Sequence, residues 1–371
     1  MMVMCHIPEG VLDQNLPQSL WVNIAINEIM DGHLKDPIFC LVMSIKAMPI
    51  KLKDDDMTKI IDLKMDLPMT AEEFAEKMKY LVLNKNAKGV ANYRRIFGPR
   101  YAASLGVSIE DLEKKSVELP LQEFDALLVS LAQKIVPTPD QFITQLDKAD
   151  IEWCLIDDPD NKKTYEYMKH APDRLKGSAI FNPHEGSKGV KKMENAIKEL
   201  GFKAVYATSF LHKIKPSDRR FYPFYTKALE LDVPVFIYTT MNYSTELPMD
   251  IAHPINIDRI AMDFPDLKIV ASSGGWPWVP DLVGVARRHR NVYIDVSSHR
   301  PKYLATPGSG FEMLLQYANT LLQDQILFGS GVGDLGLKIG QVVEEMKALP
   351  IKESVKEKWL YLNAVRLFEK K

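Results

Sequence analysis

Two ionisable side chains of opposite charge, Lys64 and Asp66, end the segment "TKIIDLKMD", directly after an apolar run. Residues two apart on a β-strand point to the same side, so this spacing places an ammonium and a carboxylate together at the end of the strand. A lysine in a poorly solvated site can lose its proton and act as a base or a Schiff-base amine, and its carboxylate neighbour can act as a general acid or base. The same pair can equally be a structural ion pair. Both interpretations stay open on the sequence alone.

A second candidate stretch is "IVASSGGWPW", residues 269–278, in which an apolar run stops at two serines. This pattern is typical of a buried strand whose end delivers side chains to a pocket. We expect Ser273 and Trp276 to lie near a bound substrate, although aromatic packing at a pocket rim or a subunit interface is the simpler interpretation of Trp276.

The elements that must position these residues alternate regularly from residue 138 onward. Short apolar runs rich in β-branched residues are separated by segments of helical period, which indicates a parallel sheet covered on both faces. With the strand at 58–64, eight strands favour a closed (β/α)8 TIM barrel over an open sheet. The later runs lie at 153–157, 178–181, 203–208, 234–239, 268–272, 291–296 and 325–330.

The predicted domain organisation is an N-terminal extension, residues 1–57, followed by the barrel, residues 58–371. Residues 67–137 are far longer than a normal connection between strand and helix, so they form a helical insertion after the first strand. Thr70 and Glu73 have the spacing of a helix capping box. Because loops after the strands lie on the face of such a barrel that carries active sites, we expect a lid or a pocket wall here. Helices are predicted near 70–84, 108–114 and 120–133.

Composition excludes several classes of function. The 371 residues are 46% hydrophobic and 26% charged, with a formal net charge of −2, so nothing attracts the chain to nucleic acid or anionic lipid. The three cysteines form no disulfide pattern, and the start of the chain lacks the features of a signal peptide, which together predict a cytoplasmic protein. No phosphate-binding loop, dinucleotide motif or serine-hydrolase motif is present.

At the level of longer segments, the chain resembles the amidohydrolase-related (type 2) barrels, the family of the aminocarboxymuconate semialdehyde and γ-resorcylate decarboxylases. The resemblance covers about residues 138–371 and rests on "AMDFPDLKIV", "GWPW" and "NVYID" in this order, followed by "ILFGSG" and "YLNAVRLF". It implies a barrel whose strand ends usually hold a divalent metal. At the matching ligand positions this chain has other residues, namely Lys64, Asp66, Tyr238, Ser273 and Gly331.

These substitutions predict that the usual metal is lost and that no cofactor replaces it, with the Lys64 ammonium in the place of the dication. On this hypothesis Lys64 holds an anionic group, Asp66 is the general acid or base, and Tyr238 polarises a carbonyl, unless its phenol merely fills space. The resemblance adds substrate-binding candidates from the loops after the strands. They are Ser273, Asp295, His299, Arg219 and Trp276.

Three functions follow from this interpretation. The first is a metal-independent lyase (decarboxylase or hydratase) or lactone-type hydrolase that acts on a small carboxylate-bearing or cyclic substrate. The second is a catalytically inactive pseudoenzyme that binds a ligand or a partner. The third is a metal enzyme whose ligands have moved, for example to His299, Asp334 and Asp295. By analogy with its relatives the chain is expected to form a homodimer, with no nucleic-acid or membrane partner.

Overall fold

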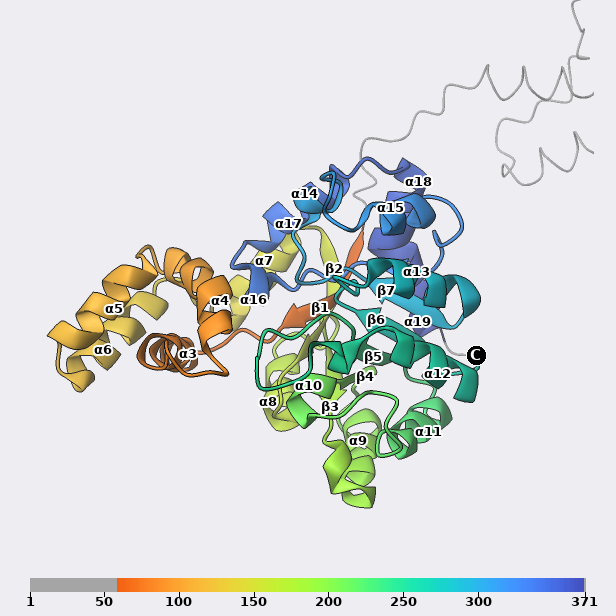
Figure 1. Cartoon of the computed structure of the whole chain (residues 1–371), viewed down its shortest axis with the longest axis horizontal. Coiled ribbons are helices and arrows are strands. Elements are labelled where there is room, and N and C mark those ends of the chain that lie inside the picture. The colour runs from red at the N-terminus through yellow and green to blue at the C-terminus, as the bar shows by residue number, and fades with distance from the viewer. Residues whose placement is uncertain (1–58, 370–371) are drawn as a thin grey trace, which may run out of the picture. The chain divides into compact units, whose positions relative to one another are not determined.

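Eight parallel strands form one sheet in the order β1 to β8 (Figure 1). The computed structural model describes residues 59–369, and the predicted extension at 1–57 lies outside them. The (β/α)8 barrel predicted from the sequence is confirmed, with a strand at each of the eight apolar runs. The strands are β1 Ile60–Asp66, β2 Ile151–Asp157, β3 Leu175–Ile180, β4 Ala204–Ala207, β5 Val235–Tyr238, β6 Ile269–Ser272, β7 Val292–Asp295 and β8 Ile326–Leu327.

Backbone hydrogen bonds join β1 to the chain at the end of β8 and so close the barrel. The amide of Leu63 donates to the carbonyl of Phe328 at 2.9 Å, and the amide of Gly331 donates to the carbonyl of Lys64 at 2.8 Å. The buried carboxylate of Asp62 bridges the same seam, since its Oδ1 accepts the amides of Lys64 at 3.1 Å and Ser330 at 2.9 Å.

A β-bulge lies in β1 beside Lys64. Asp62 pairs with Cys154 and Met65 with Ile156, so three residue steps on β1 match two on β2. Bulges change the direction of a side chain relative to a regular strand. This irregularity therefore helps to aim Lys64 toward the strand ends.

Helices surround the sheet and bury a continuous apolar layer between themselves and the strands (Figure 1). They are α7 Pro139–Lys148, α8 Asn161–Met168, α9 Ser187–Lys198, α10 Ser209–His212, α11 Tyr222–Glu230, α12 Ile255–Asp263, α13 Val279–Arg288, α14 Pro301–Leu304, α15 Glu312–Ala318, α16 Val332–Leu335, α17 Ile339–Lys347, α18 Glu353–Glu357 and α19 Asn363–Phe368. Short turns of helix also occur at Pro183–Glu185, Met249–Ala252 and Lys358–Leu362.

The last helix, α19, covers the end of the barrel opposite the candidate site. Ala364 and Leu367 are buried in one cluster with strand residues such as Ile61. The Phe368 ring packs edge-on against Trp153 of β2 at 5.3 Å between centroids. A bound ligand can therefore enter the barrel only at the opposite end, where the carboxyl ends of the strands lie.

The predicted insertion consists of four helices, α3 Ala71–Leu83, α4 Ala91–Ser104, α5 Ile109–Glu118 and α6 Leu121–Ala132. They share a hydrophobic core of their own, separate from that of the barrel. Thr70 and Glu73 form the predicted capping box at the start of α3. The helix α4 was not predicted, because the Gly98-Pro99 pair inside it normally interrupts a helix.

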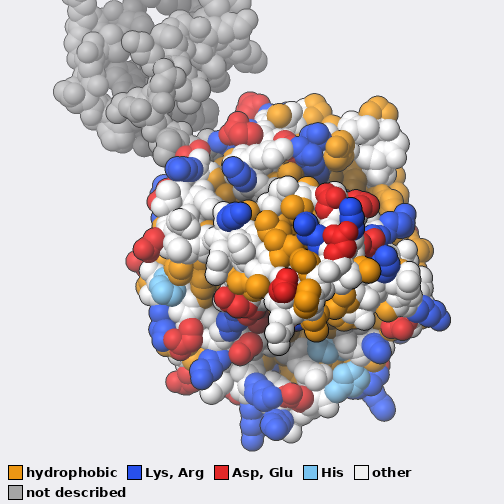
Figure 2. Space-filling model, turned by 90° about the vertical axis from the view of Figure 1, so that its left-hand side faces the viewer, with side chains coloured by type: hydrophobic (Ala, Val, Ile, Leu, Met, Phe, Trp, Pro, Cys, Tyr) orange, Lys and Arg blue, Asp and Glu red, His pale blue; other side chains and the backbone are white. Residues whose placement is uncertain are grey.

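The exposed side of the insertion carries apolar residues among charged ones (Figure 2). At least half of the surface of each of four apolar residues is exposed: Tyr80 (57%) and Leu83 (50%) of α3, Val117 (87%) of α5 and Leu121 (58%) of α6. No helix between residues 59 and 369 has both the length and the apolar character needed to span a membrane.

Candidate functional site

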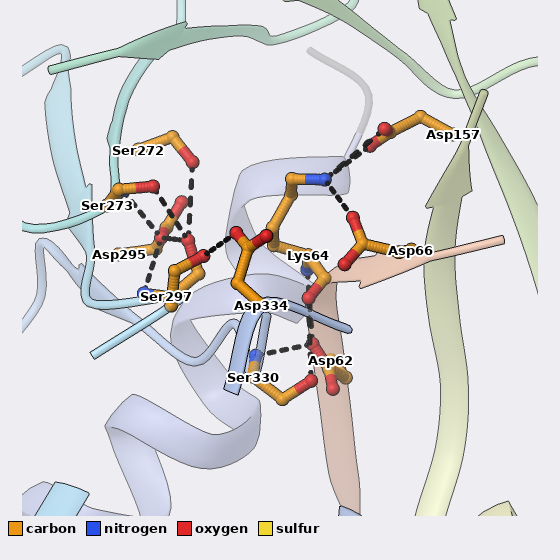
Figure 3. A network of polar contacts seen from close by, with 11 residues as sticks. Asp62, Lys64, Asp66, Asp157, Ser272, Ser273, Asp295, Ser297, Ser330 and Asp334 are labelled. Carbon is orange, nitrogen blue, oxygen red and sulfur yellow. Dashed lines mark hydrogen bonds and ion pairs between the residues drawn. The ribbon is translucent and has the colours of Figure 1, made fainter. Parts of the chain in front are cut away.

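The Lys64 side chain ends between two carboxylates, which we call the Lys64 cluster: Lys64, Asp66 and Asp157 (Figure 3). Its Nζ donates to Asp66 Oδ1 at 3.1 Å and to both oxygens of Asp157 at 3.0 and 3.2 Å. The Lys64 and Asp157 side chains are only 11% and 10% exposed, against 35% for Asp66. The structure therefore brings the predicted Lys64–Asp66 pair together and adds Asp157 to it.

Electrostatics within this cluster favour the charged forms of Lys64 and Asp66, whereas burial raises the pKa of the Asp157 carboxyl. Burial opposes the charged form of Lys64, but the carboxylates of Asp157 and Asp66 raise its pKa well above the ordinary value. Burial opposes ionisation of Asp66 as well, yet the Lys64 ammonium lowers the pKa of this carboxyl. Both shifts favour the ion-paired form of Lys64 over the neutral base or Schiff-base amine that the sequence left open.

A cavity of about 680 Å³ opens at the strand ends, between α4 of the insertion and the loops after β5, β6, β7 and β8. Its wall combines aromatic rings with a few polar groups. The residues that matter below are Phe97, Arg100, Tyr238, Trp276, His299 and Asp334.

Asp334 faces this cavity and also lies close to the Lys64 cluster. Burial raises the pKa of its carboxyl, and the negative charge of Asp66 raises it further. Ser298 Oγ donates to Asp334 Oδ2 at 2.8 Å. The preceding residue, Gly333, lies so near Asp66 that an added Cβ would come within 2.2 Å of its Oδ2. Asp334 is thus a cavity residue whose protonation depends on the charge of Asp66 in the Lys64 cluster.

Arg100 is the cationic group that the insertion contributes to the cavity. Its Nη1 donates a long hydrogen bond, 3.4 Å, to the carbonyl of Asp334. Its guanidinium also lies over the Phe97 ring, 5.5 Å from the centroid. Within residues 59–369 Arg100 makes no ion pair, so its charge is available to an anionic ligand.

The predicted residues Ser273 and Asp295 belong to a buried polar network (Figure 3). They do not line the cavity. Asp295 Oδ1 accepts the amide of Ser273 at 3.1 Å, and the amide and hydroxyl of Ser297 at 2.9 and 2.5 Å. The Ser273 carbonyl in turn accepts a hydrogen bond from His299 Nε2 at 3.1 Å. His299 therefore lines the cavity, while Ser273 and Asp295 are held in the buried network that contacts it.

The remaining predicted residues divide between the cavity and the surface. Tyr238 lines the cavity, where its hydroxyl donates to the carbonyl of Met241 at 3.0 Å, and burial raises the pKa of this phenol well above 10. Trp276 lines it too, and its Nε1 donates to the carbonyl of Ser309 at 3.2 Å. Arg219 is exposed just before α11, and the structure does not bring it to this cavity.

Two site residues were not found from the sequence, Asp157 and Arg100. A signal for Asp157 was present, because β1 and β2 both end in aspartate and these two residues pair directly in the sheet. No local pattern marks Arg100, since its position depends on the packing of α4 over the loops of the barrel.

Many solved structures have a similar fold. An uncharacterized TIM-barrel protein, Bb4693 from Bordetella bronchiseptica, is 24% identical, with 83% of this chain and 98% of that chain covered and a TM-score of 0.60. A 2,6-dihydroxybenzoate decarboxylase from Rhizobium is 14% identical, covering 84% and 99%, with a TM-score of 0.54. A 5-carboxyvanillate decarboxylase from Novosphingobium aromaticivorans is 15% identical, covering 84% and 96%, also with a TM-score of 0.54. The comparison with curated proteins found no match.

One of these structures corrects the prediction about cofactors. The sequence analysis predicted that the chain uses no metal, whereas the decarboxylase from N. aromaticivorans is complexed with manganese and 4-hydroxy-3-methoxy-5-nitrobenzoic acid. The prediction is contradicted by this bound metal in the same fold. Within the described part of this chain, however, no group of three or more His, Cys, Asp or Glu side chains is placed to hold a metal ion, so these residues do not fit such a site.

The family model described as Amidohydrolase (Amidohydro_2) matches residues 110–370. This range contains seven of the eight strands, from β2 to β8, together with the loops that form most of the cavity wall. The resemblance seen in the sequence is thus confirmed over more than half of the chain. The chain belongs to the amidohydrolase family.

Proposed function

We propose that the chain is a lyase that removes carbon dioxide from a small, ring-containing carboxylate bound in the cavity. The observation that carries this proposal is that a free cation, Arg100, and a carboxyl group with a raised pKa, Asp334, face one cavity lined by aromatic rings. The two decarboxylases of the same fold support the reaction class by analogy.

Arg100 anchors the substrate carboxylate in this proposal. A guanidinium can bind a carboxylate through two parallel hydrogen bonds, which fixes orientation as well as position. Phe97, which lies under the guanidinium, and Trp276 provide flat apolar surface for a ring. These features select a planar acid over a flexible aliphatic one.

Asp334 supplies the proton that the reaction consumes. The ring carbon that carries the carboxylate takes the proton of the Asp334 carboxyl. The bond from this carbon to the carboxylate then breaks, carbon dioxide leaves, and the electron pair of the broken bond returns to the ring. Solvent returns a proton to Asp334 afterwards. A carboxyl group performs this step near neutral pH only if its pKa is raised, as burial and the charge of Asp66 do here.

The Lys64 cluster acts through Asp334 in this scheme. Lys64 keeps Asp66 ionised, and the resulting negative charge helps Asp334 to retain its proton. Lys64 itself is not expected to bind the substrate, because two carboxylates already balance its charge. The same balance favours the second candidate, a pseudoenzyme that binds a carboxylate ligand without turnover.

A panel of hydroxybenzoic and related aromatic acids tests these candidates. We expect one or more acids to bind in calorimetry and to release carbon dioxide. Asp334→Asn should reduce turnover about 10²–10⁴-fold and leave binding within a few-fold of the parent protein. Lactones and unsaturated acids in the same panel test hydrolysis and hydration.

The outcomes separate the candidates. Binding without any turnover would favour the pseudoenzyme. Full activity of Asp334→Asn would show that the proton comes from elsewhere, and a panel with no binding at all would contradict the assigned cavity.

A further inference from the structure

His299 is fixed in one tautomer by a backbone carbonyl. A carbonyl oxygen only accepts hydrogen bonds, so the 3.1 Å contact with the Ser273 carbonyl requires a proton on His299 Nε2. Burial, together with a smaller effect of the Arg100 charge, lowers the pKa of this imidazole to about 4. At neutral pH the ring therefore carries one proton, on Nε2, and Nδ1 has a free lone pair.

The position of this carbonyl depends on an unusual turn. Ser273, Gly274 and Gly275 have φ angles of +68°, +66° and +74°, which place three consecutive residues in the left-handed region. A serine is rarely stable in that conformation and persists there only when neighbours hold it. A Cβ on Gly274 would approach the Phe311 ring to 3.0 Å, so the turn is also tightly packed.

Asp295 holds the turn from below. Its Oδ1 accepts the Ser273 amide at 3.1 Å, and its backbone carbonyl accepts the Gly274 amide at 2.7 Å. The carboxylate is fully buried and sits at the end of β7, on the rigid part of the barrel. Through these bonds a strand end determines where the Ser273 carbonyl points.

We propose that His299 Nδ1 is the proton acceptor of the cavity and that Asp295 is a positioning residue that fixes its tautomer through the Ser273 turn. The imidazole lines the cavity and is held edge-on by Phe311 at 4.9 Å between ring centroids. Asp295 and Ser273 touch no ligand and act only through this ring.

This proposal rests on the proposed function for its chemical role. A hydroxyl group of the substrate would pass its proton to Nδ1, which drives electrons into the ring and makes the carbon receptive to the Asp334 proton. After carbon dioxide leaves, the imidazolium returns its proton to the product oxygen. The net reaction consumes one proton, which Asp334 supplies, so all atoms and charges balance.

The charged groups around His299 set its behaviour with pH. Arg100 from α4 disfavours the imidazolium. The other titratable groups that line the cavity are Asp334 after β8, and Tyr238 and Tyr243 from β5 and its following loop, whose raised pKa values keep both phenols neutral at neutral pH. A bound substrate carboxylate would neutralise Arg100 and so raise the basicity of Nδ1 at the moment when it is needed.

The tautomer can be measured without any substrate. In protein labelled with ¹⁵N-histidine, two-bond ¹⁵N–¹H correlations distinguish Nδ1–H from Nε2–H, and His299→Gln identifies the signal. We expect a neutral Nε2–H ring from pH 5 to 8. An Nδ1–H tautomer, or titration near pH 6.5, would overturn the proposal whatever the reaction proves to be.

Asp295→Asn tests the positioning role by the same spectrum. An amide can still accept the Ser273 amide but adds an N–H donor to the buried network, so we expect the His299 signal to show a mixture of tautomers. A spectrum that stays purely Nε2–H in a folded variant, as judged by circular dichroism, would remove Asp295 from the proposal.

The catalytic role needs turnover. His299→Gln keeps an N–H near the Nε2 position but lacks the basic lone pair, so kcat should fall about 10²–10⁴-fold while binding of the acid changes less than about three-fold. His184→Gln is the matched control, because that histidine lies outside the cavity, bonded to the carbonyl of His212. Unchanged kcat in His299→Gln, on an acid that the parent protein decarboxylates, would refute the assignment without affecting the proposed function.

Discussion

Two groups of polar side chains lie at the same end of the barrel and differ in how their charges are balanced. In the Lys64 cluster one ammonium is enclosed by two carboxylates within 3.2 Å. Around the cavity, Arg100 has no ion-pair partner among residues 59–369, His299 retains a free lone pair, and Asp334 has a raised pKa. Charged groups that are paired with opposite charges stabilise the structure. Charged or polar groups without such partners can interact with a ligand. The residues that first draw attention in the sequence belong to the balanced group.

The largest effect is expected from breaking the Lys64 cluster. Lys64→Met leaves two carboxylates, one of them buried, without their cation, and should lower the free energy of unfolding by about 3–5 kcal/mol. Urea denaturation measures this loss. Lys64→Met combined with Asp157→Asn should recover part of it. A single variant as stable as the parent protein would show that the cluster does not support the fold.

A smaller effect should come from Asp62, a buried carboxylate on the same strand that has no counter-charge. Burial raises the pKa of Asp62 to about 7 from 3.8, so the folded protein loses stability as the pH rises from about 4 to 7. At ~1.4 kcal/mol per pKa unit, the difference between these two pKa values means that Asp62 can lower the free energy of unfolding by at most about 4 kcal/mol over this pH range.

Asp62→Asn should abolish this contribution. Denaturation at pH 4 and at pH 8 is compared for the two proteins, because the difference between them cancels the titration of other groups. Equal pH dependence in both would mean that folding does not raise the pKa of the Asp62 carboxyl.

Removing the unbalanced cation should affect binding and not folding. Arg100→Ala should weaken the binding of a carboxylate ligand about 10–100-fold, which corresponds to a charged hydrogen bond of about 1.5–3 kcal/mol. Arg95→Ala is the matched control, because Arg95 is exposed on the same helix and does not line the cavity. Equal loss of affinity in both variants would indicate a general charge effect.

The smallest effect is expected at Tyr238, where a catalytic role and a packing role were both open. Its hydroxyl is already bonded to the Met241 carbonyl, so Tyr238→Phe should cost about 1 kcal/mol of stability and less than ten-fold in turnover. Thermal unfolding and kcat are measured together. A loss of a hundred-fold or more in kcat at unchanged stability would restore Tyr238 as a catalytic residue.

The eight strands were predictable because buried parallel strands are continuous apolar runs, which need no knowledge of distant contacts. The Lys64–Asp66 pair was predictable for a similar reason, since both residues lie on one strand. Asp157 lies 93 residues from Lys64, and only the common aspartate at the end of β1 and β2 hinted at it.

Arg100 shows where prediction from the sequence failed. The arginine chosen from the sequence, Arg219, follows a barrel strand, which is the usual source of site residues in this fold. The cation that lines the cavity comes instead from α4. This helix was not predicted because Gly98 and Pro99 lie within it. Its location follows from tertiary packing of the insertion, which no local pattern encodes.

The separate hydrophobic core of the insertion has an evolutionary consequence. Because α3 to α6 are stabilised mainly by one another, this segment can accumulate substitutions, or be exchanged for another, without unsettling the eight strands. In the proposed function the insertion contributes Arg100 to the cavity, and the barrel contributes His299 and Asp334. Substitutions in the insertion could then alter which carboxylate is bound while the proposed proton-handling residues stay in place.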